Sequence, residues 1–294
     1  MANVFSADEI DFNAYMEVTD SEHRVRPAEE YCDKVIDYFH GKGNFGSKLP
    51  WEKTHNLIQF RKGETTVWGG YNGHGKSLVL GQVMNHFMRG QERICIASME
   101  MKPHITMARM CHQAAKGIPS VEYITQYHTG TSGLLWLYDQ QGMITGQKVI
   151  AVIRYANEKF GIQHFVADSL LKFGYAEDDY NGQKHFVDSL CSVARDTGVH
   201  IHLVHHSRKG KDETAIPGKF DMKGSGSIID QVDNLIIVFR NKAKEEMNPE
   251  LRDQKDPDVR LVVEKQRNGE WEGHLKFWFD PASRALVESP VYGF

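Results

Sequence analysis

Residues 65–80 read TTVWGGYNGHGKSLVL, and this stretch decides the fold. Residues 70–77 match the pattern G-x-x-x-x-G-K-[ST], whose glycines let several backbone N–H groups point at one chain of phosphates. A β-rich run precedes the pattern and an apolar run that suits a helix follows it, and the N-terminus of a helix attracts anions. The sequence therefore predicts a strand, a phosphate-binding loop and a helix, in that order.

This loop predicts a site for a nucleoside triphosphate. Lys76 is expected to bridge the β- and γ-phosphates, and Ser77 is expected to ligate Mg²⁺. The expected cofactors are therefore Mg²⁺ and ATP, or another NTP or dNTP. The expected nucleotide-binding residues are Gly70, Gly73, Gly75, Lys76 and Ser77.

Strands and helices alternate along most of the remaining chain. The strands are expected at 65–68, 93–98, 164–168, 200–205, 235–239, 259–264 and 274–279, and the helices at 76–88, 104–115, 146–159 and 186–197. Such alternation indicates an α/β fold with a mainly parallel, twisted sheet and helices on both of its faces. Asn268-Gly269 separates the last two strands and suits a hairpin turn, so an antiparallel pair is expected at the sheet edge.

The composition excludes several other classes of protein. Hydrophobic residues make up 40% and charged residues 25% of the 294 residues, as in ordinary globular proteins. No apolar run approaches the roughly 20 residues of a membrane helix, and the first residues lack the features of a signal peptide. The four cysteines are far apart and form no C-x-x-C. This spacing argues against a zinc site or disulfides and favours a reducing cytoplasm.

Charge separates an acidic N-terminal segment from the rest of the chain. Residues 1–23 hold six Asp or Glu and no Lys or Arg, so the net charge of −4 leaves the remainder at +2 and permits binding to a polyanion. We expect an extended or partly disordered segment at 1–26, a linker with a short helix at 27–48 and an ATPase domain at 49–294. The apolar stripe of the linker helix consists of Ala28, Tyr31, Cys32, Val35, Tyr38 and Phe39.

Three further positions complete an expected ATPase site. Hydrolysis needs a carboxylate near the metal, a group that orients water and groups that stabilise the developing charge. Asp168 and Glu100 each end an apolar strand and suit the first two roles, and His206 follows a third strand and suits a hydrogen bond to the γ-phosphate. A turn-capping Asp168 and a solvent-facing Glu100 are the alternatives. We expect His200 and His202 to be structural histidines rather than metal ligands.

Several motifs, in this order along the chain, resemble those of the DnaB-type (superfamily 4) hexameric replicative helicases. The likeness is strongest to the helicase half of phage primase–helicases and to the mitochondrial Twinkle helicase, and it covers about residues 49–287. Besides the phosphate-binding loop and His206, it rests on residues 98–101 (SMEM), 221–228 (DMKGSGSI) and 264–269 (EKQRNG). It implies a RecA-like core and a ring-shaped, ATP-dependent translocase on single-stranded DNA that unwinds duplex DNA with 5′–3′ polarity.

The resemblance also implies roles for individual residues. Within one subunit, the implied half of the catalytic site consists of Lys76, Ser77, Asp168 and Glu100, with Glu100 as the catalytic base. Lys265 and Arg267 are implied to reach into the neighbouring subunit's site, where Arg267 serves as an arginine finger. A surface role for a hairpin arginine is the alternative.

A charged loop directly follows the expected sensor. Residues 207–223 hold five basic and three acidic side chains, and such a loop suits the phosphates of a single strand. By resemblance, the DNA-binding residues are Arg208, Lys209, Lys211, Lys223 and Gly224. A solvated charged loop is the alternative, and residues 171–181, with Lys172 and Phe173, are a second candidate.

The resemblance further implies partners. The linker helix is implied to dock on the adjacent subunit and assemble a ring, whereas packing on its own domain is the alternative. No primase region is recognisable upstream of the ATPase domain, so a separate primase and a DNA polymerase are expected partners at the replication fork. This minimal architecture suggests a phage protein in the bacterial cytoplasm. The rival functions are a RecA- or clock-type ATPase without unwinding activity and a small-molecule P-loop kinase.

Overall fold

A ten-stranded sheet forms the centre of the protein. The computed structural model describes residues 3–5, 10–16, 27–40, 46–140, 142–175, 178–207, 214–222 and 226–290. In spatial order the strands are β1 (Asn3–Phe5), β6 (Leu135–Tyr138), β5 (Ile94–Ser98), β7 (His164–Asp168), β8 (His200–Val204), β4 (Thr65–Gly69), β9 (Asn234–Arg240), β10 (Val259–Gln266), β11 (Gly273–Asp280) and β12 (Ala285–Val287). From β1 to β9 in this spatial order, each strand is parallel to its neighbours. Strands β10, β11 and β12 each pair in antiparallel fashion with the strand before them. The expected parallel sheet with an antiparallel hairpin is confirmed.

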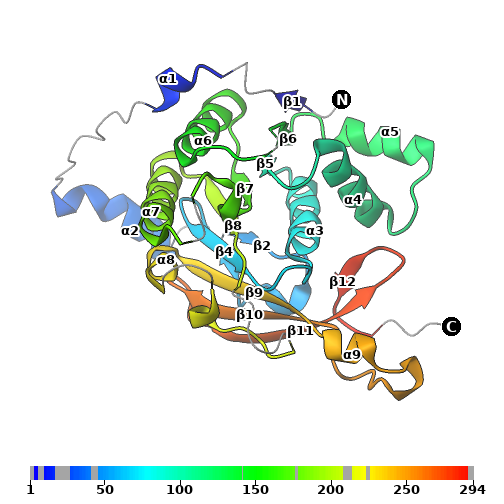
Figure 1. Cartoon of the computed structure of the whole chain (residues 1–294). Helices are drawn as coiled ribbons and strands as arrows, with labels where there is room; N and C mark the ends of the chain where they lie inside the picture. The colour runs from blue at the N-terminus through cyan, green and yellow to red at the C-terminus, as the bar shows by residue number, and fades with distance from the viewer. Residues whose placement is uncertain are drawn as a thin grey trace.

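Helices cover both faces of the sheet (Figure 1). The α-helices from residue 76 onward are α3 (Lys76–Arg89), α4 (Pro103–Ala115), α5 (Val121–Gly130), α6 (Gly146–Phe160), α7 (Tyr180–Thr197), α8 (Gly226–Gln231) and α9 (Lys242–Glu246). Buried side chains of α6 and α7 form one core with the sheet, and those of α3 and α4 form the other. A short hairpin of β2 (Ser47–Lys48) and β3 (Gln59–Phe60) lies beside the second core.

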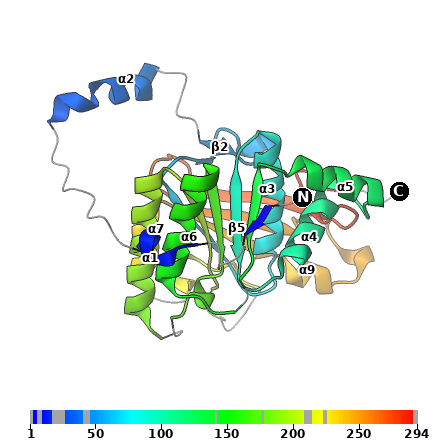
Figure 2. The same cartoon turned by 90° about the horizontal axis from the view of Figure 1, so that it is seen from above.

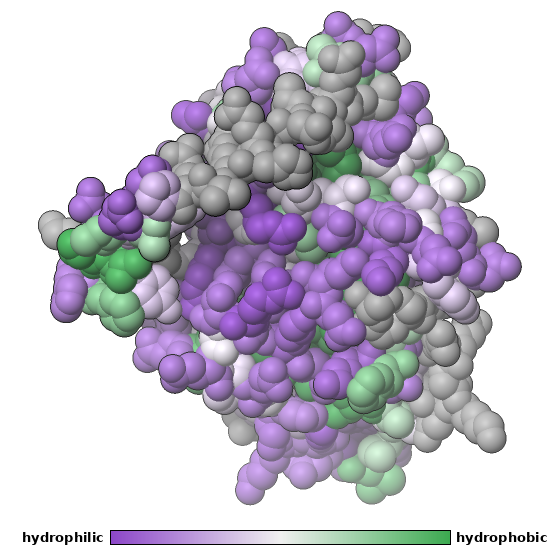
Figure 3. Space-filling view, turned by 90° about the vertical axis from the view of Figure 1, so that its left-hand side faces the viewer, coloured by the Kyte–Doolittle hydropathy of each residue, from purple (hydrophilic) through white to green (hydrophobic). Residues whose placement is uncertain are grey.

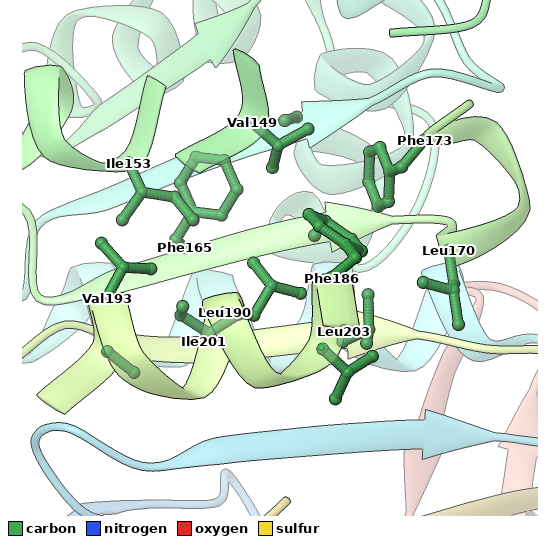
Figure 4. Packing of buried hydrophobic residues seen from close by; sticks show 14 of the residues in the cluster. Val149, Ile153, Phe165, Leu170, Phe173, Phe186, Leu190, Val193, Ile201 and Leu203 are labelled. Carbon is green, nitrogen blue, oxygen red and sulfur yellow. The ribbon is translucent and has the colours of Figure 1, made fainter. Parts of the chain in front are cut away.

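The first core shows why the predicted periodicity gives this packing. Val149 and Ile153 of α6 and Phe186, Leu190 and Val193 of α7 recur at helical spacing and point at the same face of the sheet (Figure 4). Strands β7 and β8 meet them with apolar side chains that are buried throughout. The central strands are therefore covered on both faces, as a parallel sheet requires.

The strand order brings the carboxyl ends of four parallel strands together. Strands β5, β7, β8 and β4 are consecutive neighbours in the sheet. Asp168 ends β7, while Glu100 and His206 follow β5 and β8. The phosphate-binding loop follows β4 at the same edge. In open α/β sheets this edge is where ligands bind.

Two parts of the acidic N-terminal segment contact the domain. β1 extends the sheet beside β6, and α1 (Phe12–Met16) packs on α6. The rings of Tyr15 and Tyr155 meet edge to face with centroids 5.6 Å apart, and Ile10 is buried. These contacts join residues far apart in sequence, and composition alone does not predict them.

The linker helix stands away from the body of the protein. Helix α2 (Cys32–His40), preceded by a 3-10 turn at Ala28–Tyr31, has no buried residue. Figure 2 shows it projecting beyond α7, and Figure 3 shows an apolar patch on this projection. Its exposed apolar side chains include Tyr31, Val35, Ile36, Tyr38 and Phe39. The alternative that this helix packs on its own domain does not hold in the isolated chain.

Buried histidines link the central strands. The indole Nε1 of Trp68 donates to Nδ1 of His202 at 3.1 Å, so the proton of this ring lies on Nε2. His202 Nε2 then donates to Nδ1 of His164 at 3.1 Å, and His164 Nε2 donates to Glu92 Oε2 at 2.7 Å. Each donor in this row of hydrogen bonds therefore has an acceptor.

His200 is held neutral beside that row. Its Nδ1 donates to the carbonyl of Arg61 at 2.7 Å, and its Nε2 accepts from Thr66 Oγ1 at 2.9 Å. Burial lowers the pKa of His200 to about 3, and burial also lowers the pKa of His202. The structural interpretation of His200 and His202 is confirmed, since both rings are buried in the core.

Candidate active site

Two glycines give the phosphate-binding loop its path between β4 and α3. Gly75 directly precedes α3 with φ of +88°, in the left-handed region that favours glycine. A Cβ at Gly70 would collide with the carbonyl oxygen of Val238, because the loop passes close to β9. The motif therefore has glycine where the backbone needs it.

Lys76 is buried beneath this loop. Its side chain donates to the carbonyls of Gly70 at 2.8 Å and Tyr71 at 2.9 Å. Burial lowers the pKa of Lys76 to about 8, against the opposing effects of Asp168 and Glu100. Because an anion favours the protonated ammonium, a triphosphate in the loop would raise this pKa and be bound by the charge.

Ser77 and Asp168 bring two side-chain oxygen atoms together beside the loop. Ser77 Oγ donates to Asp168 Oδ2 at 2.7 Å, and the carboxylate is buried. Burial raises the pKa of Asp168, because desolvation disfavours the charged form. Mg²⁺ prefers oxygen ligands and would favour the ionised carboxylate, so the two residues fit a magnesium ion.

Glu100 meets His206 and Ser169 at the same edge. Ser169 Oγ donates to Glu100 Oε1 at 2.7 Å, and His206 Nε2 lies 3.6 Å from the same oxygen. The interaction with His206 is the largest cause that lowers the pKa of Glu100 to about 2. Glu100 is therefore a carboxylate at any neutral pH, as a group that accepts a hydrogen bond from water must be.

These residues line one cleft of about 390 Å³ at the carboxyl edge. The predicted residues in its lining are Gly73, Gly75, Lys76, Ser77, Glu100, Asp168 and His206. The cleft also contains three arginines that the sequence analysis missed, Arg109 from α4, Arg240 at the end of β9 and Arg284 between β11 and β12. Positive charge thus exceeds negative charge in the cleft, which suits a triphosphate.

A second, smaller cleft adjoins the loop. It is lined by Gly75 and Leu78 of the loop and of α3, and by Arg240 and Phe279 from β9 and β11. His74 supports its wall, because its Nδ1 accepts from the backbone N–H of Arg240 at 3.1 Å. A planar cation and an aromatic ring beside a phosphate site can hold a flat, apolar group.

Lys265 and Arg267 lie at the opposite edge of the sheet. Gln266 pairs with Asn234, the first residue of β9, and Asn234 pairs with Thr66 at the start of β4. The two cations therefore sit at the amino ends of the strands whose carboxyl ends form the cleft. The seven residues of β9 separate the two edges by roughly 20 Å. The structure does not bring these two residues into the site of their own chain.

The structure corrects one alternative and leaves other predictions untested. Phe173 is fully buried, so it is not a DNA contact. The predicted DNA-binding residues Arg208, Lys209, Lys211, Lys223 and Gly224 lie outside the described residues. Within the described part of the chain, no three His, Cys, Asp or Glu side chains could hold a metal, and the four cysteines are unpaired. No helix there is long and apolar enough to cross a membrane.

The fold and the cleft together define a P-loop ATPase with a RecA-like core. Residues 54–286 match the family model of the DnaB-like helicase C terminal domain, so the chain belongs to that family. It is an ATP-dependent replicative DNA helicase, and proteins of this family bind nucleotide, act on DNA and oligomerise. This assignment sets aside the kinase and the RecA- or clock-type ATPase.

Solved structures share the fold. One is described as "The Structure Of A DnaB-Like Replicative Helicase And Its Interactions With Primase"; at 14% identity, with 90% of this chain and 67% of that chain covered, the TM-score is 0.71. Another is the ATPase domain of a phage protein; at 14% identity, with 89% of this chain and 98% of that chain covered, the TM-score is 0.72. A search of curated proteins found no match.

Proposed function

We propose that each ATP site of this helicase is completed by two subunits of a hexameric ring. One subunit supplies the cleft with Lys76, Glu100 and Asp168, and the next supplies Lys265 and Arg267. The observation that carries the proposal is the placement of the two cations at the amino edge of the sheet, about 20 Å from the cleft of their own chain. A cation placed there can complete only another chain's site.

In this proposal the cleft orients the reaction. Mg²⁺, held by Ser77 and Asp168, would neutralise charge on the β- and γ-phosphate oxygens. Glu100 accepts a hydrogen bond from the attacking water and directs its oxygen at the γ-phosphorus. His206 donates to a γ-phosphate oxygen, and the neighbour's Arg267 stabilises the charge that develops there.

The second cleft is proposed to hold the nucleobase. Arg240 and Phe279 flank the loop on the side away from Asp168 and Glu100, since they come from β9 and β11. Stacking on a ring and a guanidinium plane does not read the edge of a base. The arrangement therefore supports the use of several nucleotides, ATP among them.

Ring assembly is proposed to use α2 of the adjacent subunit. A groove of about 810 Å³ runs over α4 and α5, with an apolar floor that includes Ile105, Met107 and Ile124. Its charged lining consists of Arg109, Arg284 and Asp139, a net positive charge, and His104, His112 and His128 also line it. Helix α2 and its preceding turn match it with exposed apolar residues and four acidic ones, Glu29, Glu30, Asp33 and Asp37. In Figure 1, α2 lies on the opposite side of the protein from α4 and α5. The groove is lined by residues of α4 and α5, so this arrangement favours docking between chains.

Single-stranded DNA is proposed to run through the centre of the ring. Arg208, Lys209, Lys211, Lys223 and Gly224 would hold its phosphates. His206 directly precedes this loop, so a change in its contact with the γ-phosphate moves the loop's first residues. Translocation with 5′–3′ polarity, a separate primase and polymerase at the fork, and a place in the bacterial cytoplasm complete the proposal.

A forked-duplex unwinding assay tests this function. We expect the protein to separate the strands only with hydrolysable ATP and Mg²⁺, and single-stranded DNA to stimulate its ATPase activity. Lys76→Ala is the matched control, because it removes the phosphate-binding cation and leaves the DNA loop unchanged. ATP hydrolysis that is indifferent to DNA, with no strand separation, would contradict the proposal.

A further inference from the structure

The two cations at the amino edge are held by one short helix end. Lys265 Nζ donates to the carbonyls of Ile229 at 2.8 Å and Asp230 at 2.9 Å. Arg267 Nη2 donates to the carbonyls of Asp230 at 3.0 Å and Gln231 at 3.1 Å. The last carbonyls of a helix have no partner inside it and carry partial negative charge, so they attract both side chains.

Asp233 adds a full negative charge in direct contact with Arg267. Its Oδ1 lies 3.3 Å from Arg267 Nη1, and its side chain is only 10% exposed, whereas that of Arg267 is 44% exposed. The guanidinium is therefore held on one side and open on the other.

Asp233 is itself fixed to the start of the sheet. Its Oδ2 accepts from the backbone N–H of Thr65 at 2.9 Å, and its own N–H donates to the carbonyl of Thr65 at 3.0 Å. Its carbonyl accepts from the backbone N–H of Arg267 at 2.8 Å. One carboxylate oxygen of Asp233 thus binds the backbone of β4, and the other faces the guanidinium of Arg267.

We propose that Asp233 is the positioning residue of the trans-acting finger, which it holds ready for the neighbour's γ-phosphate. The inference rests on the proposed function, because it needs Arg267 to act on the adjacent site. A long arginine side chain without a partner samples many rotamers, and a positioned one loses less freedom when it meets the phosphate. Asp233 touches no substrate and acts only through Arg267.

Asp233→Asn isolates this role. The amide keeps the size of the side chain and its oxygen can still accept from Thr65, but the charge that faces Arg267 is lost. We expect kcat for ATP to fall roughly 10- to 100-fold, as misplaced catalytic groups generally cause, with unchanged affinity for a non-hydrolysable ATP analogue and unchanged ring formation. Asp188→Asn, on the exposed face of α7, is the matched control and should retain wild-type kcat.

Mixed rings separate positioning from a general structural effect. Lys76→Ala subunits keep a working finger but have a defective cleft, whereas Asp233→Asn subunits keep a working cleft. Rings mixed from Asp233→Asn and Lys76→Ala subunits should therefore recover ATP hydrolysis. The recovered rate should equal that of rings mixed from Arg267→Ala and Lys76→Ala subunits. A mixture of Asp233→Asn with Arg267→Ala should stay inactive, because neither subunit has a working finger.

Two results would overturn the proposal. The first is a wild-type kcat for Asp233→Asn. The second is that rings of Asp233→Asn and Lys76→Ala stay inactive, although rings of Arg267→Ala and Lys76→Ala recover ATP hydrolysis. If Asp233→Asn does not assemble, Asp233→Glu takes its place, since it keeps the charge, shifts it by one methylene and must show the same recovery. Full activity of Arg267→Ala alone would instead overturn the proposed function.

Discussion

Replacing His200 by Asn should weaken the acid sensitivity of the fold. The pKa of His200 is lowered to about 3 in the fold, against 6.5 for a free histidine. The unfolded chain therefore takes up a proton below pH 6.5 that the folded chain does not. The stabilisation is complete above that pH and is lost as the pH falls towards 3, because stability rises with pH wherever the unfolded state binds more protons.

The size of the effect follows from the two pKa values. Each pH unit below 6.5 costs about 1.4 kcal/mol, so the loss at pH 5 is about 2 kcal/mol from His200 alone. The free energy of unfolding is measured by urea titration, followed by tryptophan fluorescence, at about pH 7.5 and about pH 5. The difference between the two values should be about 2 kcal/mol smaller for His200→Asn than for the wild type.

Comparing two pH values removes the constant cost of the substitution. The variant loses the packing of the imidazole ring and the hydrogen bond from Thr66, and these losses destabilise it equally at both pH values. His185→Asn, exposed on α7, is the matched control and should retain the wild-type difference. If His200→Asn loses as much stability on acidification as the wild type, His200 is not held neutral and the reasoning is refuted.

Other predictions concern the cleft and the ring. Glu100→Gln should bind an ATP analogue as the wild type does but lose turnover at least about 100-fold; isothermal titration and a phosphate-release assay check this, and near-normal turnover would exclude Glu100 as the base. His206→Ala removes the main cause of the low pKa of Glu100, so the acid limb of the kcat profile should move to higher pH; an unmoved limb would contradict their contact. Removing residues 1–42, or the single change Phe39→Asp, should leave a folded domain that no longer forms rings by analytical ultracentrifugation. Leu251→Asp, at a residue that is 77% exposed and does not line the groove, should still form them. Hexamers of the truncated chain would refute docking by α2.

The local part of the fold follows from the sequence. The phosphate-binding loop depends on backbone geometry at Gly70 and Gly75, which residue types alone specify. The alternation of strands and helices places Glu100, Asp168 and His206 at strand ends, and a parallel sheet then brings those ends together. For these residues, motif and topology determine position.

The remainder depends on contacts between distant segments. Arg284 reaches the cleft from the turn after β11, and β1 joins β6 although more than a third of the chain separates them. Helix α7 begins at Tyr180, six residues before the predicted start at 186. The side chain of Asp179 caps this end by accepting a hydrogen bond from the backbone N–H of Gly182. The first turn is polar and has no apolar stripe, so the periodicity does not predict it. Phe173 belongs to the second candidate segment for DNA contact, because that segment directly follows Asp168, but the fold buries its side chain.

The central claim is that one ATP site needs two chains, and mixing two inactive variants tests it most directly. Lys76→Ala lacks a working cleft and Arg267→Ala lacks a working finger, so each alone should lose ATP hydrolysis, by about 10³-fold or more for the finger. In rings assembled from equal amounts of both, about one quarter of the interfaces join an intact cleft to an intact finger. We predict DNA-stimulated hydrolysis near that fraction of the wild-type rate. Mixed rings that stay as inactive as either parent, or an Arg267→Ala protein that hydrolyses ATP normally by itself, would contradict the claim.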